Sequence, residues 1–401
     1  MGSPSAKEKW SLRTPILNSD RKRVPSNFVS YYFCPTRSDF EPMPKFRLGR
    51  TRLLLMLQSA DMGVSVSLSS ARREHALKRI RKDFGRVTIV FLALATLAFS
   101  GSSLGAENTS DWVTGSPREP IHIKAWPGGK KVAVCFVFDV EVWGFGHGPN
   151  FRPDMTARDP DVVDEGFRQY AIEWGVPRVG RLFNEEGMPL SIVLNAAFPE
   201  KYPEVWKTLR SSAPKAPIIA HGVNNSTDQL PLGRGLDEQQ AYIRRTLSQL
   251  EKNTGVRPHG WSSPSVYPNA DTFRASAAEG ITYSLDGMDS DVLSRLNTKS
   301  GPLVLIPYPA TTVDMGQYLS RFKEPSDMER LWIDYITELA HEAETHPDRD
   351  ATVVAIGIHP FVIGTPNGTA ALHRVLENLK SQKLVWVTDT QAVMDAADQK
   401  Q

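Results

Sequence analysis

The sequence predicts an α/β fold built as a single, distorted (β/α)7-type barrel. From Lys131 to the carboxyl terminus, apolar runs that suit strands alternate about seven times with segments that suit helices. This alternation is typical of parallel βαβ units. Several runs are apolar without interruption, as expected of strands buried on both faces. Residues 131–401 show no internal repeat and indicate one domain.

The first predicted strand carries the most informative signal. Two glycines precede an apolar run from Val132 to Phe138, which ends abruptly in Asp139 and Glu141. A buried strand that delivers carboxylates at its carboxyl end is typical of the catalytic face of α/β barrels. The alternative is that Asp139 caps the next helix and Glu141 is solvated.

The remaining elements follow in order. A long loop is expected over 143–164, and long loops after barrel strands are often functional. Helices of period 3.6 end at glycines that suit the left-handed cap position, as at Gly187 and Gly255. Strands are expected at 190–194, 216–220, 259–262, 282–285, 303–306, 352–358 and 384–387, and helices at 175–186, 202–209, 236–252, 272–278, 325–345, 370–379 and 390–396.

Three of the predicted strands end in reactive side chains. These are Asp139 with Glu141, then His221, then His359. A single histidine at a strand end is more often structural. The carboxyl ends of parallel strands converge on one face of a barrel, however, so three such signals in one chain favour a common site.

Five short motifs succeed one another along the chain. They are 138–141 (FDVE), 218–226 (IIAHGVNNS), 257–264 (RPHGWSSP), 283–291 (YSLDGMDSD) followed by 306–308 (IPY) and 314–315 (DM), and 357–360 (GIHP). In this order they resemble the motifs of the polysaccharide deacetylase (NodB-homology) family, over about residues 121–396. The likeness is greatest to the peptidoglycan-deacetylase-like and allantoinase-like branch. The resemblance implies the NodB-homology barrel and hydrolysis of a non-peptide C–N bond.

The resemblance also implies roles for the residues at the strand ends. Asp139 would be the general base and His359 the general acid that protonates the leaving nitrogen. Glu141, His221 and Asn225 would hold a divalent metal, zinc or similar, or polarise the substrate carbonyl directly.

Asn225 is the main departure from the family pattern. In the common family motif a second histidine follows the first by four residues, and Asn225 occupies that position after His221. The first motif departs as well, because Asp139-Val140-Glu141 stands where two adjacent aspartates are usual. An asparagine oxygen is a poor zinc ligand. The sequence is therefore compatible both with a site that binds a metal and with a site that does not. In a metal-free site, Asn225 would donate a hydrogen bond to the carbonyl oxygen of the substrate.

Three further residues are expected to bind substrate. Trp261 and Tyr308 would line the pocket, because sugars stack on aromatic faces, although ordinary core packing of Trp261 is an equal alternative. Asp314 is included for its place in the fourth motif.

Residues 1–106 differ in charge from the rest. They contain 18 lysine and arginine residues against 7 acidic ones, whereas the remainder contains 29 against 38. A basic stretch precedes a 13-residue apolar run, Val87 to Phe99, and small residues follow up to Ala106. This is the layout of a secretory signal peptide, and the run is too short for a membrane span. We therefore expect a signal region over 62–106, a doubtful or disordered extension over 1–61, and a surface lead-in over 107–130.

These observations predict a periplasmic or secreted carbohydrate deacetylase that acts on N-acetylated glycans. The alternatives are an allantoinase-like hydrolase of a small amide or ureide, and a barrel that binds glycans without catalysis. Residues 107–401 contain more acidic than basic residues, and the sequence has no glycine-rich phosphate-binding loop. Both observations argue against binding of nucleic acid. The two cysteines, Cys34 and Cys135, cannot form a disulfide framework in the mature domain. We expect no membrane span after cleavage, and the sequence leaves the oligomeric state open.

Overall fold

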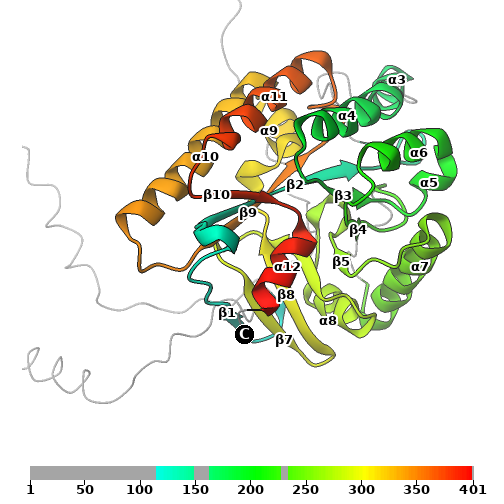
Figure 1. Ribbon diagram of the computed structural model, residues 1–401. Coiled ribbons are helices and arrows are strands. Elements are labelled where there is room, and N and C mark those ends of the chain that lie inside the picture. Colours follow the sequence, from blue (N-terminus) through cyan, green and yellow to red (C-terminus); the bar gives the residue numbers. More distant parts are fainter. Residues whose placement is uncertain (1–113, 149–161, 227–233, 400–401) are drawn as a thin grey trace, which may run out of the picture. The chain divides into compact units, whose positions relative to one another are not determined.

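The computed structural model describes residues 114–148, 162–226 and 234–399 (Figure 1). The predicted extension and signal region therefore lie outside the described residues. Within the described ranges, none of the helices combines the length and the apolar character that a bilayer crossing requires.

The strands and helices alternate along most of this part of the chain. The strands are β1 (Arg118–Pro120), β2 (Val132–Val140), β3 (Ser191–Leu194), β4 (Ile218–Ala220), β5 (Gly260–Trp261), β6 (Tyr283–Gly287), β7 (Ser294–Thr298), β8 (Gly301–Pro307), β9 (Thr352–Ile358) and β10 (Val385–Thr388). The helices are α3 (Val162–Tyr170), α4 (Val176–Glu186), α5 (Phe198–Lys201), α6 (Pro203–Ser212), α7 (Leu236–Thr254), α8 (Ala270–Ala278), α9 (Asp314–Arg321), α10 (Pro325–Thr345), α11 (Pro366–Lys380) and α12 (Thr390–Asp398).

Seven parallel strands form the wall of the predicted barrel. Their order is β9-β2-β3-β4-β5-β6-β8, and every neighbouring pair in it is parallel. β8 and β9 contact each other, but no hydrogen-bonded ladder joins them in the described part of the chain. The mixed α/β architecture confirms the fold class that the sequence predicted.

β2 lies at the centre of this arrangement. It pairs with β9 over Val132–Phe138. β10 pairs with the first half of β2 and β3 with the second half. Because a strand has only two hydrogen-bonding edges, β3 and β10 share the edge opposite β9.

Two layers of apolar side chains fill the space on either side of the strands. The outer layer lies between the strands and the helices that surround them in Figure 1. It includes Phe136 of β2, which packs edge to face on Phe183 of α4. The inner layer fills the barrel and includes Cys135 of β2 and Val393 of α12. The hydroxyl oxygen of Thr390, at the start of α12, lies 3.2 Å from that of Ser191 at the start of β3. Helix α12 therefore covers the amino end of the barrel.

The structure adds elements that the sequence pattern did not indicate. β1 and β7 are antiparallel additions at the edge of the sheet, beside β8. β1 and the buried Ile121, Ile123 and Trp126 lie in the expected lead-in, so the folded part extends upstream of Lys131. The expected loop over 143–164 contains the start of α3.

Candidate active site

The twofold repeat of the strands sets the direction of the reactive side chains. Along β2, Ala133, Cys135 and Val137 belong to the inner layer, and residues 132, 134, 136 and 138 to the outer one. Successive side chains of a strand point to opposite faces, so Asp139 continues the inward series. Both Asp139 and Glu141 are buried at the carboxyl end of the strand.

The same repeat directs the two histidines inward from their own strands. On β4, the inner-layer Ile219 precedes His221 by two residues, and on β9 the inner-layer Ala355 precedes His359 by four. His221 and His359 are 1% and 3% exposed. Together with Asp139 and Glu141, they form a polar layer above the apolar interior.

His221 lies between a backbone carbonyl and a carboxylate. Its Nδ1 is 2.8 Å from the carbonyl oxygen of Ser262, so Nδ1 carries a proton and donates it. Its Nε2 lies 3.1 Å from Glu141 Oε1. Burial is the largest single influence and disfavours an imidazolium, but the hydrogen bond to Glu141 and the negative charges of Glu141 and Asp139 together outweigh it, so the pKa of His221 lies above its ordinary value. The pair thus holds either a proton or another cation between two electron-rich atoms.

The donor set on this side of the site fits a divalent metal. Asp139, Glu141 and His221 each offer a ligand atom, and these atoms lie within 4.8 Å of one another. Two carboxylates and one imidazole suit zinc or a similar ion. Glu141 Oε2 is buried and accepts no hydrogen bond from the part of the chain that the structure describes, which is costly unless a cation or ligand occupies the site.

Asn225 forms a hydrogen bond with Glu141. Its side-chain amide donates to Glu141 Oε1 at 2.6 Å. Its own Oδ1 is buried, and no group among the described residues donates a hydrogen bond to it. The expected donation to a substrate carbonyl would compete with the bond to Glu141, whereas Oδ1 could accept a hydrogen bond from a ligand without that competition.

His359 is held by a carboxylate on the other side of the site. Its Nδ1 lies 2.6 Å from Asp314 Oδ1, and its backbone N–H donates to Asp314 Oδ2 at 2.7 Å. Burial alone would lower its pKa, but the surrounding carboxylates, Asp139 first, raise the pKa of His359 to about 10. Nε2 of this imidazolium faces the centre of the site.

Asp139 lies between the two histidines. Its Oδ2 is 3.8 Å from His359 Nε2, which lies 3.9 Å from Glu141 Oε2. Burial raises the pKa of Asp139 to about 7, with His359 opposing the rise and Glu141 adding to it. A carboxyl group with this pKa exchanges protons readily near neutral pH.

Comparison with known proteins identifies solved structures with a similar fold. No protein-family model matches the sequence. A Schizosaccharomyces pombe protein described as "Putative polysaccharide deacetylase" is 20% identical over 315 residues, which are 71% of this chain and 95% of that protein. A solved structure with a similar description, from Mycobacterium smegmatis, is 24% identical with a TM-score of 0.58 and is matched over 96% of its length and 71% of this chain. The chain has the polysaccharide deacetylase fold.

Two further solved structures share this fold. Puue allantoinase is 25% identical, with a TM-score of 0.58 over 70% of this chain and 93% of its own. A protein described as a probable polysaccharide deacetylase, from Pseudomonas aeruginosa PAO1, is 24% identical with the same TM-score, over 70% of this chain and 94% of its own. The similarity therefore includes proteins described as polysaccharide deacetylases and an allantoinase.

The three residues expected to bind substrate take other places in this deacetylase fold. Trp261 belongs to the outer layer, where it packs edge to face on Tyr242, so it points away from the inward-facing polar layer. Asp314 is fully buried and engages His359 through both oxygens. Tyr308 lies in the inner layer and is 1% exposed. Its hydroxyl contacts Asp139, as described below.

The sequence analysis did not identify the groups that hold the reactive side chains in place. The Asn195 side chain accepts the backbone N–H of Val142 at 2.8 Å and donates to the carbonyl of His221, tying the ends of β2 and β4 together. The Ser262 carbonyl fixes His221. Asn195 stands directly after β3, at the same strand-end position as the histidines, and that position is the signal that could have identified it.

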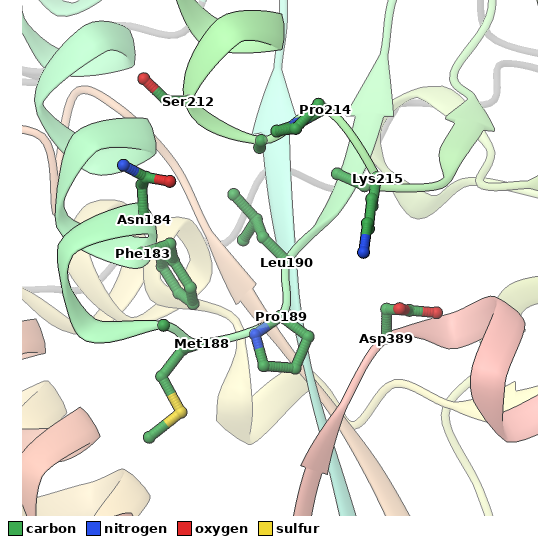
Figure 2. Close-up of a pocket in the computed structure, with 12 residues that line it drawn as sticks. Phe183, Asn184, Met188, Pro189, Leu190, Ser212, Pro214, Lys215 and Asp389 are labelled. Carbon is green, nitrogen blue, oxygen red and sulfur yellow. The ribbon is translucent and has the colours of Figure 1, made fainter.

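A separate pocket of about 330 Å³ lies away from these residues (Figure 2). Its lining comes from the segments that precede β3 and β4, together with Asp389. The side chain of Lys215 extends toward Asp389 in this view (Figure 2). The pocket is therefore at the amino ends of the strands, whereas parallel barrels carry their reactive groups at the carboxyl ends. We place the active site at the latter.

A second group of metal-binding residue types is explained without a metal. Glu186, His373 and Glu377 bring ligand atoms together between α4 and α11. The Lys380 ammonium lies 2.6 Å from both carboxylates and already neutralises them. Among the described residues, no lysine or arginine forms an ion pair with Asp139 or Glu141, and so this buried group is the better cation site.

Proposed function

We propose that the protein is a carbohydrate deacetylase that hydrolyses the acetamide bond of N-acetylated glycans. The observation that carries this proposal is the opposed pair of Asp139 and His359, one suited to accept a proton and the other to donate one. The raised pKa of Asp139, about 7, and that of His359, about 10, match these two tasks near neutral pH.

In this mechanism Asp139 removes a proton from the water that attacks the acetamide carbon. His359 donates its Nε2 proton to the departing nitrogen, so that the amine leaves without a negative charge. Asp314 keeps the ring of His359 in one orientation by holding its Nδ1. Both proton transfers take place in a buried layer, where charged groups interact more strongly than in water.

Glu141, His221 and Asp139 are the residues that would hold a divalent metal. A bound metal would polarise the substrate carbonyl and help to stabilise the oxyanion. Asn225 holds Glu141 Oε1 and so fixes the direction of that carboxylate. Asp139 would then both help to hold the metal and accept the proton of the water.

The second candidate is an allantoinase-like hydrolysis of a small cyclic or linear ureide. Glu141 Oε2 and Asn225 Oδ1 are buried acceptors to which no described residue donates, and a ureide offers several N–H groups to such atoms. The structural similarity to an allantoinase also supports this second candidate function.

A direct assay separates these functions. The purified protein is incubated with chitin oligosaccharides and, in parallel, with allantoin, and acetate release and allantoin loss are measured. The proposed function requires acetate release that Asp139→Asn abolishes. Allantoin loss alone would select the second candidate. Turnover of neither substrate, with glycan binding retained by Asp139→Asn, would favour a non-catalytic glycan-binding barrel.

We also propose that the protein is exported and that cleavage follows Ala106. The basic stretch, the apolar run and the small residues of 62–106 support this. Mass spectrometry of the protein recovered from the culture medium or periplasm should give Glu107 as the first residue. Recovery in the cytoplasm with 62–106 still attached would contradict it.

A further inference from the structure

Tyr308 makes a contact with the proposed base that its expected role as a pocket wall does not explain. It follows β8 directly, and its hydroxyl donates to Asp139 Oδ2 at 3.3 Å. The side chain is 1% exposed and belongs to the inner layer. The hydroxyl therefore meets the carboxylate inside the barrel, beneath the face that substrate would approach.

The neighbouring strand is shaped to admit this hydroxyl. Gly357 of β9 lies two residues before His359, on the inward-facing side of the strand. Any Cβ at Gly357 would collide with the hydroxyl and ring of Tyr308. The absence of a side chain there is thus a steric requirement for the contact between Tyr308 and Asp139.

The contact uses one of the two oxygens of Asp139. Oδ2 accepts from Tyr308 and is also the oxygen that lies 3.8 Å from His359 Nε2. Among the described residues, none donates a hydrogen bond to Oδ1. An imidazolium and a carboxylate attract each other and close to about 2.8 Å when nothing holds them apart. Here they stay about an ångström further apart.

We propose that Tyr308 is a positioning residue for the proposed deacetylation, on which this inference rests. Its hydroxyl anchors Oδ2 of Asp139, keeps the carboxylate from pairing directly with His359, and leaves Oδ1 to take the proton of the attacking water. Base and acid then remain separate charges instead of a closed ion pair.

The barrel offers a matched control in Tyr283. This tyrosine is also 1% exposed and in the inner layer, and it too packs against a glycine, Gly260, of the adjoining strand. Its hydroxyl lies 3.0 Å from Thr390 at the amino end of the barrel, far along the strands from the reactive layer. Tyr283→Phe therefore removes a comparable buried hydroxyl without touching Asp139.

The kinetic test compares Tyr308→Phe with Tyr283→Phe in acetate release, with thermal unfolding measured for both. Loss of one hydrogen bond to a charged group corresponds to about a 10- to 100-fold fall in kcat for Tyr308→Phe, with KM little changed. Tyr283→Phe should lose a similar amount of thermal stability and keep the wild-type kcat. Wild-type kcat in Tyr308→Phe, or an equal fall in both variants, would overturn the proposal.

A second measurement does not depend on turnover. Crystal structures of the wild type and of Tyr308→Phe report the position of the Asp139 carboxylate directly. We expect Oδ2 to move toward His359 Nε2, to well under 3.8 Å, in the variant. An unmoved carboxylate would overturn the role of Tyr308. A wild type that releases no acetate would overturn the proposed function, and the crystal structures would still decide the role of Tyr308.

Discussion

The two histidines of the site occupy equivalent places in the fold and differ in what their Nδ1 atoms contact. Both follow a parallel strand, point inward and are almost fully buried. Nδ1 of His221 donates to a neutral backbone carbonyl, whereas Nδ1 of His359 faces the carboxylate of Asp314. Nε2 of each points to the centre of the site.

This difference assigns the two residues opposite tasks. A neutral partner leaves the imidazole of His221 free to lose its Nε2 proton and to offer a lone pair to a cation held by Glu141. A carboxylate partner favours the imidazolium form of His359, as a general acid requires. One side of the site therefore suits binding and polarisation, and the other suits proton donation. Asp139 serves both.

The largest effect should come from the residue that the two sides share. Asp139→Asn keeps the shape of the side chain and removes the base, and we expect kcat for acetate release to fall about 10²- to 10⁴-fold. Because burial raises the pKa of Asp139, the uncharged amide should not destabilise the fold. Unfolding by urea would check this. Retained turnover in a folded variant would remove Asp139 from the mechanism.

On the His221 side, Glu141→Gln should weaken metal binding by at least about 100-fold, because a carboxylate ligand becomes a neutral amide. Titration of the chelator-treated protein with zinc, followed by calorimetry, measures the affinity. Glu377→Gln, in the surface group bridged by Lys380, is the matched control and should leave the affinity unchanged. If Glu377→Gln has the larger effect, the metal binds at the surface.

On the His359 side, Asp314→Asn should lower kcat by about 10- to 100-fold while metal affinity stays the same. The sign of its pH effect follows from the pKa. The carboxylate of Asp314 helps to raise the pKa of His359, so the acid form persists to high pH. Without that carboxylate the pKa falls, and activity should be lost at a lower alkaline pH than in the wild type. An unshifted alkaline limb of the pH–kcat profile would contradict this assignment.

The smallest effect should come from Asn225, whose side-chain amide holds the carboxylate of Glu141. Asn225→Ala removes the 2.6 Å hydrogen bond to Glu141 Oε1, while His221 still contacts that oxygen. We expect about a tenfold loss in metal affinity, with a matching loss of kcat at limiting metal. Excess zinc should restore most of the activity. Failure of excess zinc to restore it would indicate that Asn225 contacts the substrate.

Much of the fold and the reactive layer could be predicted from the sequence because both follow simple periodicities. The strand at Thr352–Ile358 and the helix at Pro325–Thr345 have the predicted bounds. The strand-end positions of Asp139, His221 and His359 follow from uninterrupted apolar runs, and the structure brings these side chains together.

The missed helices bury polar side chains, which a search for apolar stripes does not select. α3 buries Asp164 and Arg168 and exposes Val162 and Val163. α9 likewise buries the polar Asp314 and Gln317. The partners that define the site are also long-range. Asp314 meets His359 across 45 residues, and Ser262 meets His221 across 41, so only the tertiary fold reveals them.

The most direct test of the difference between the two sides is the metal content and activity of His221→Gln and His359→Gln, measured side by side. Both variants are purified with zinc present, analysed by elemental mass spectrometry and assayed for acetate release. We predict that His359→Gln keeps the wild-type metal content and loses activity, whereas His221→Gln loses both. Equal metal content in the two variants, whether full or empty, would contradict it.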